Sequence, residues 1–369
     1  MKRICATVML AVCGALCSFA GDDVAGRQFV KADSDALSWV GRVDLKKGYA
    51  DFTFPGVQMR TGFTGSSLQM LTKANSGYFV VEIDNRPAFK IRSTPTDSLL
   101  TLAANLGKGQ HKAVVTLVSE GYEMQPRIYG LYVDKDATVK SVALPGRKIE
   151  FIGNSITCGY GNEAVSEKCG FDYATENQWD AYDALTARKL NAQCFVVARS
   201  GIGIYRDYGA PRQGTDYNMP NTYKYTQFGQ KGELWDFSRF TPDVVCLNLG
   251  TNDTSLDTYD TMLLTRGYVE FVKTLRSHYP NAKIVLLTGT MMSGKALEDV
   301  KRALDTAQNA AADRGDNNVY RFDMTPMMPG SVWCRLSSVG SKPSENGGRT
   351  ERVSPSADEL VSKDFEVYI

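Results

Sequence analysis

Polar and hydrophobic residues alternate through the first third of the chain, with almost no helical periodicity. The clearest runs are residues 51–54, 78–83, 112–118 and 127–133. Clusters of glycine, proline, asparagine and aspartate separate these runs at the spacing typical of β-sandwiches. The pattern predicts an all-β sandwich domain, a jelly roll, over residues 21–145.

The pattern changes after a short linker at residues 144–148. From there, apolar strand-like runs alternate with segments of helical period, which is typical of a parallel sheet covered by helices. We therefore expect an α/β domain, with a parallel sheet, over residues 146–369. The expected strands are 149–153, 194–198, 243–249, 283–287 and 319–322, and the expected helices are 180–190, 259–278 and 296–314.

The first twenty residues have the pattern of an export signal. Lys2 and Arg3 precede an apolar stretch, residues 4–16, that is too short to span a bilayer. Small residues at Ser18 and Ala20 then predict cleavage after Ala20, so we expect a secreted or periplasmic protein. Lipidation at Cys13 or Cys17 is a weaker alternative, because Val12 and Leu16 stand where a small residue is expected.

Composition narrows the classes of partner. Apolar residues make up 43% of the chain and charged residues 22%, which is normal for a globular protein. Lys and Arg number 42, Asp and Glu 41, and the formal net charge is +1. This balance gives no support for binding to nucleic acid or to an anionic membrane surface, and we expect no membrane span.

One short stretch carries the strongest chemical signal. The apolar run of residues 149–152 ends in Gly153, and Asn154 and Ser155 follow. This arrangement predicts a strand that runs into a tight turn and a helix start, where open α/β sheets bind ligands. Ser155 could also be a simple helix cap, and the neighbouring strand ends decide between the two interpretations.

Two further strand ends carry groups that suit a serine nucleophile. The second expected strand leads to Ser200 and Gly201, and the third leads to Gly250, Thr251 and Asn252. A serine nucleophile needs N–H donors aimed at the developing oxyanion. The N–H groups of Ser155 and Gly201 and the side-chain amide of Asn252 are donors of this kind. Gly201 as a turn residue and Asn252 as a helix cap are the alternative interpretations.

These three strand ends resemble the first three sequence blocks of the SGNH hydrolases. The wider resemblance is to carbohydrate esterase family 2, exported acetyl esterases with an N-terminal jelly roll. It extends from Trp39 to about Trp333. The stretches that carry it are residues 39–42, 147–150, 175–177, 204–209 and 235–243.

The resemblance implies an O-acetyl esterase that acts on plant polysaccharides or oligosaccharides without a metal or cofactor. Ser155 would be the nucleophile, and Ser155, Gly201 and Asn252 would form the oxyanion hole. Candidate substrate contacts are Trp179, Tyr205, Asp253 and Trp333, although packing is an equally good explanation for the aromatic residues, and Asp253 is also suited to ordering its loop.

The fourth block of the family, Asp-x-His-Pro, is missing, and its histidine is the general base. The chain has two histidines, His111 and His278. We expect both to be structural, because His111 lies beside a strand of the sandwich and His278 ends a helix.

A frameshift just after Trp333 accounts for the missing block. If each codon from Cys334 starts one base later, the allowed readings include Ala-Asp-Tyr-His-Pro-Ser, with the histidine overlapping the codon of Ser337. The tail from about residue 334 would then be out of frame. Alternatively the frame is correct, Ser354 replaces the histidine, and the protein is naturally inactive.

The cysteines are the remaining chemical feature. Of eight cysteines, Cys5, Cys13 and Cys17 would leave with the signal. Cys158 and Cys169 flank the loop after Ser155 and form the best candidate disulfide, because export permits one. Cys194 and Cys246 lie in apolar runs and are expected to be buried thiols.

Two other functions stay open from the sequence. Without a base, the same cleft could serve a carbohydrate-binding protein that does not hydrolyse its ligand. A lipase-type SGNH esterase is a weaker alternative, because the chain has a β-sandwich and lacks an obvious apolar lid segment.

Overall fold

The computed structural model describes residues 24–45, 48–166, 168–229 and 232–325. The leader over residues 1–20, Trp333 and the tail from about residue 334 lie outside these ranges. No helix within the described ranges is long and apolar enough to cross a membrane.

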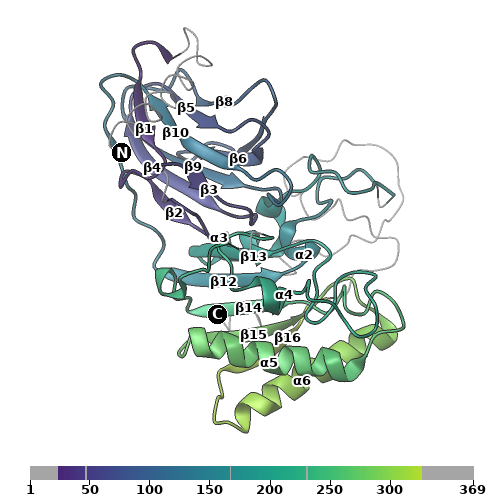
Figure 1. Ribbon diagram of the computed structural model, residues 1–369. Helices are drawn as coiled ribbons and strands as arrows, with labels where there is room; N and C mark the ends of the chain where they lie inside the picture. The colour runs from purple at the N-terminus through teal and green to yellow at the C-terminus, as the bar shows by residue number, and fades with distance from the viewer. Residues whose placement is uncertain (1–23, 46–47, 167, 230–231, 326–369) are drawn as a thin grey trace, which may run out of the picture.

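Residues 28–140 form two antiparallel sheets, as the alternating pattern predicts (Figure 1). One sheet has the order β1-β10-β5-β8 with β3 on β10, and the other has the order β11-β4-β9-β6-β7 with β2 on β4. A shared apolar core fills the space between them. The strands are β1 Gln28–Lys31, β2 Ser38–Val40, β3 Ala50–Asp51, β4 Gln58–Thr64, β5 Leu68–Thr72, β6 Gly77–Ile83, β7 Phe89–Ser93, β8 Leu99–Ala103, β9 Gln110–Leu117, β10 Arg127–Val133 and β11 Val139–Lys140.

The second part of the chain forms a parallel sheet of order β13-β12-β14-β15-β16. The strands are β12 Arg147–Gly153, β13 Ala192–Ala198, β14 Val244–Asn248, β15 Lys283–Thr288 and β16 Val319–Asp323. The helical segments are α2 Ser155–Cys158, η2 Gln178–Asp180, α3 Tyr182–Lys189, α4 Met219–Thr222, η3 Phe237–Arg239, α5 Thr261–His278 and α6 Gly294–Ala312. The predicted α/β fold is confirmed, with element ends within two residues of the expected ones.

Helices cover both faces of this sheet. Helices α5 and α6 pack on one face and share a core with Ile152, Val245 and Ile284. Helices α2 and α3 contribute to the core on the other face, which includes Phe151 and Val285. Figure 1 shows α5 and α6 along the side of the sheet that lies away from the sandwich.

The direction in which successive strands are added to the sheet reverses at β12. β13 is added on one side of β12, and β14, β15 and β16 follow on the other. Ligands of open α/β sheets bind at the carboxyl ends of the strands at such a point. By this rule the expected ligand site lies after β12, where Ser155 follows the strand.

Candidate active site

Ser155 is the first residue of α2, directly after β12. Asn154 accepts a hydrogen bond from the Ile156 N–H at 3.0 Å, and Gly159 ends the helix with φ of 76°. A Cβ atom at Gly153 would collide with Thr157, so the turn requires glycine there. The helix cap is Asn154, so Ser155 is not needed in that role, and its side chain is half-buried.

Gly201 lies in the loop after β13, with φ of 82°, a value that favours glycine. Its carbonyl oxygen accepts the Tyr208 N–H at 2.8 Å. On its other side, the Ser200 N–H donates to Glu120 Oε1 at 2.8 Å. The loop is therefore held on both sides of the Gly201 N–H, which donates to no residue that the structure describes.

Asn252 follows β14 and is buried. Its Nδ2 donates to the Ile202 carbonyl oxygen at 2.7 Å. A carboxamide nitrogen has two hydrogens, so one remains for a ligand while the other fixes the side chain against the loop of Gly201.

The strand register brings these three segments to one edge of the sheet. Gly153 pairs with Ala198 of β13 and with Asn248 of β14. Ser155, Gly201 and Asn252 each follow one of these paired positions by a few residues. The structure thus places the predicted nucleophile and oxyanion donors at neighbouring strand ends, while their roles stay predictions.

Neither histidine is available as a base. The His111 ring bonds Asp84 Oδ2 and the Gly107 carbonyl oxygen, both at 2.8 Å, and these bonds raise its pKa. His278 ends α5, which runs back toward the amino ends of the strands, away from Ser155. It stacks on Phe237 at 3.6 Å between ring centroids, and burial lowers its pKa.

The first candidate substrate contact is Asp253. Asp253 is buried, and its carboxylate accepts the backbone N–H groups of Ile204, Tyr205 and Arg206 at 2.9–3.1 Å. This arrangement fits the loop-ordering interpretation of Asp253, and its contact with substrate stays a prediction. Burial raises its pKa.

Two aromatic candidates are also engaged in packing. Tyr205 is buried, and its hydroxyl oxygen accepts the Asp260 N–H at 2.9 Å, which ties it to the start of α5. The Arg188 guanidinium lies 4.0 Å from the centroid of the half-buried Trp179 ring. Packing accounts for both positions, and their contact with substrate stays a prediction. Trp333 lies outside the described residues.

The predicted disulfide is wrong. Cys158 and Cys169 are both free; Cys158 is buried in α2, whereas Cys169 is exposed in the following loop. The expectation of buried free thiols at Cys194 and Cys246 is confirmed. The spacing of cysteines gave the pair, but it could not show that α2 turns the Cys158 side chain inward.

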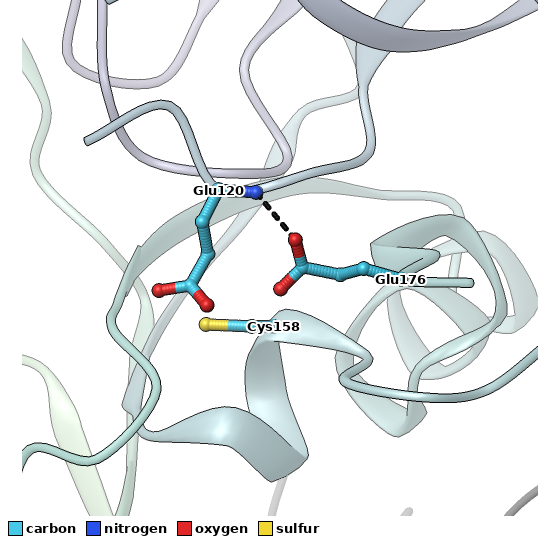
Figure 2. Close-up of side chains that lie close together, drawn as sticks. All are labelled: Glu120, Cys158 and Glu176. Atoms are coloured by element: carbon cyan, nitrogen blue, oxygen red, sulfur yellow. Dashed lines mark hydrogen bonds between the residues drawn. The ribbon is translucent and has the colours of Figure 1, made fainter. Parts of the chain in front are cut away.

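Figure 2 shows where Cys158 points instead. Its sulfur lies beside the carboxyl groups of Glu120 and Glu176, with one ligand-type atom of each within 4.8 Å of the others. Within the described ranges, this is the group that could reach one metal ion. Sequence reasoning missed Glu120, because it enters from the sandwich, and it gave Glu176 no role.

The comparisons with known proteins agree with this geometry. Residues 39–142 match the carbohydrate esterase 2 N-terminal family, and residues 151–340 match the GDSL-like lipase/acylhydrolase family. A Cellvibrio japonicus acetylxylan esterase / glucomannan deacetylase is 32% identical over 282 residues, covering 74% of this chain and 76% of that protein. The chain belongs to carbohydrate esterase family 2.

Two further proteins are similar to this chain. The cellulase/esterase CelE of Acetivibrio thermocellus is 32% identical over 298 residues, which is 78% of this chain and 36% of CelE. The chain thus spans about a third of that longer relative. A family two carbohydrate esterase from Clostridium thermocellum, solved in complex with cellohexaose, aligns with a TM-score of 0.73 and 29% identity, covering 80% of this chain and 90% of that one.

Proposed function

We propose that this family member is an exported serine esterase that removes acetyl groups from plant polysaccharides or oligosaccharides. The observation that carries the proposal is the edge of the sheet at β12, where Ser155 stands between the donors of Gly201 and Asn252. The basic and apolar pattern of residues 2–16 supports export, and the named activities of the relatives support an acetylated glycan as substrate.

The arrangement suits acyl transfer through a covalent intermediate. The Ser155 hydroxyl attacks the acetyl carbonyl carbon, and the carbonyl oxygen becomes an oxyanion. The N–H groups of Ser155 and Gly201 and the free amide hydrogen of Asn252 stabilise that charge. The sugar hydroxyl leaves with a proton, and water then releases acetate from the serine.

The proton of Ser155 needs an acceptor, and the chain has no suitable histidine. We attribute this to a frameshift after Trp333, which hides Asp-x-His-Pro in the next frame. Resequencing the gene across the codons for residues 323–360 tests this explanation. A nucleotide sequence that cannot encode Asp-x-His-Pro in any frame would contradict it and would favour the replacement of the histidine by Ser354.

Imidazole in solution offers a direct test of the site in the present chain, because it can replace a missing histidine. We expect imidazole to produce acetate release from acetylated xylan, well above the rate of the S155A variant under identical conditions. Equal rates for the two chains across imidazole concentrations would contradict a Ser155 nucleophile.

A second candidate function, glycan binding without hydrolysis, is favoured by the missing base. The Clostridium thermocellum relative binds cellohexaose in the crystal. Calorimetric titration of the present chain with cellohexaose and with acetylated xylan fragments separates the candidates. Binding that persists in S155A, together with no acetate release in imidazole, would support the binding function.

A further inference from the structure

Two buried carboxyl groups from the two halves of the chain meet beside the helix of Ser155 (Figure 2). Glu120 follows β9 of the sandwich, and Glu176 lies in the loop between α2 and η2. The Glu120 N–H donates to Glu176 Oε2 at 2.7 Å. Glu120 is 1% exposed and Glu176 is fully buried, so water does not compensate their charge.

Among the described residues, one oxygen of each carboxyl group accepts a hydrogen bond and the other does not. Glu120 Oε1 accepts from Arg199 Nη1 at 2.7 Å and from the Ser200 N–H at 2.8 Å. Glu120 Oε2 and Glu176 Oε1 are buried without a partner among the described residues. Two such acceptors cost free energy, and two adjacent buried carboxylates cannot both stay ionised without a large penalty. One proton on the pair would remove one of the two charges and would give the neighbouring carboxylate a donor, because the two carboxyl groups have oxygens within 4.8 Å of each other.

The surroundings indicate which group carries that proton. Burial first, and then the charge of Glu120, raise the pKa of Glu176 well above its ordinary value. Burial likewise raises the pKa of Cys158, so its thiol stays protonated. Among the described residues, the positive charge in contact with the carboxyl groups of the pair is that of Arg199, which contacts Glu120 and also the half-exposed Glu123. The ionisable groups around the pair are Glu123, Cys158, Tyr160, Tyr173, Arg199 and Tyr217.

The pair contacts the residue that directly precedes the proposed oxyanion donor. Glu120 holds the Ser200 N–H, and the next N–H along the chain is that of Gly201. The Tyr208 N–H holds the Gly201 carbonyl from the other side. A shift of the Glu120 carboxylate would therefore turn the peptide that precedes the oxyanion donor.

We propose that Glu120 and Glu176 share one proton, and that this pair is the device by which the sandwich positions the Gly201 N–H for catalysis. The positioning role rests on the proposed esterase function, whereas the shared proton does not. Glu120 is a positioning residue, because it acts through the loop and does not touch the substrate.

Two isosteric variants separate the roles of the two residues. In E176Q, the carboxamide can donate to Glu120 and still accept the Glu120 N–H, so it imitates the protonated acid. In E120Q, the charge that Arg199 neutralises is lost and the remaining acid has no base to share its proton. E123Q is the matched control, because Glu123 contacts the same guanidinium at 2.9 Å but is half exposed.

Infrared difference spectroscopy at neutral pH tests the shared proton. We expect E176Q to lose a carbonyl stretching band of a protonated carboxylic acid, and E123Q to keep it. A spectrum that E176Q leaves unchanged would overturn the proposal. So would tight binding of Zn²⁺ or Cd²⁺ with a thiolate absorption band that disappears in C158A, because an ion would then occupy the place of the proton.

Amide hydrogen exchange over residues 199–208 tests the positioning. We expect E120Q to speed exchange at Ser200 about tenfold, the effect of losing roughly one hydrogen bond, and E176Q to change it less than twofold. If E120Q does not fold, the comparison of the unaltered chain with E176Q still decides. The unaltered chain should lose protection above the pKa of Glu176, whereas E176Q should not.

The imidazole-rescued reaction links the loop to catalysis. We expect E120Q to lower the rescued kcat at least about tenfold with little change in KM, and E176Q to stay within twofold. Unchanged kcat in a folded E120Q would overturn the positioning role. If the unaltered chain shows no Ser155-dependent turnover, the esterase function fails, while the infrared and exchange results still decide on the shared proton and on the anchoring of the loop.

Discussion

Arg42 of the sandwich and Glu150 of β12 form a fully buried ion pair, with 3.5 Å between Arg42 Nη2 and Glu150 Oε1. The guanidinium also donates to the carbonyl oxygens of Tyr223 and Tyr225. The Tyr223 hydroxyl donates to the other oxygen of Glu150 at 2.9 Å. Burial raises the pKa of Glu150. Two charges from distant parts of the sequence thus fix the sandwich against the parallel sheet.

Removing Arg42 should destabilise the protein strongly. R42A leaves a buried carboxylate without its counter-charge, which typically costs about 3–5 kcal/mol. We expect chemical unfolding to show a loss of this size. The double variant R42M/E150Q should recover a large part of the loss, because no uncompensated charge remains. A loss below about 1 kcal/mol in R42A would contradict this account.

Asp183 should make stability fall as pH rises. Burial raises its pKa from 3.8 to about 7, so the folded state binds a proton that the unfolded state has released between these values. The free energy of unfolding should therefore decline from about pH 4 to pH 7, by up to roughly 4 kcal/mol. D183N should remove this part of the slope, because asparagine imitates the neutral acid. Parallel pH dependences for the two chains would contradict the prediction.

Asn252 should matter for turnover more than for folding. N252A removes one oxyanion donor, and such a loss typically lowers kcat about 10²–10³-fold. We expect this drop in the imidazole-rescued reaction. Losing the bond to Ile202 should cost only about 1 kcal/mol of stability. The control is N309A, which removes an exposed side chain on α6 and should change neither quantity.

Gly203 should tolerate no larger residue. A Cβ atom there would collide with the Arg206 carbonyl oxygen and the Asp253 carboxylate. G203A should therefore displace the loop that Asp253 organises and lower both the melting temperature and the rescued turnover. G146A, in the linker where a Cβ atom would meet open space, is the matched control and should change neither. A G203A chain as stable and active as the unaltered one would show that the loop can relax.

The sequence predicted elements more reliably than contacts between them. Alternation and helical period depend on local burial, so the positions of β12 and α5 could be read from the chain. The strand ends at Ser155, Gly201 and Asn252 followed from the rule that parallel strands share an edge. Asp253 was partly predicted: an ordering role was one of its two interpretations.

The residues that the sequence did not reveal are those that act across the two halves of the chain. Nothing in the sequence around Glu120 distinguishes it from an exposed acid, because its burial depends on Arg199 and Glu176, which lie far along the chain. The predicted disulfide failed for a different reason, which lies within one half of the chain. Cysteine spacing gives proximity along the loop, whereas the direction of Cys158 is set by the turn of α2.

The hydrogen bond from the Ser200 N–H to Glu120 has a consequence for experiments that separate or exchange the two domains. A hydrolase unit expressed from residue 146 onward would keep Ser155, Gly201 and Asn252, yet it would lack the acceptor that holds the Ser200 peptide and the cation that faces Glu150. The sandwich therefore supplies one acid, Glu120, and one cation, Arg42, to the other half of the chain, and a replacement sandwich needs both residues in the same places.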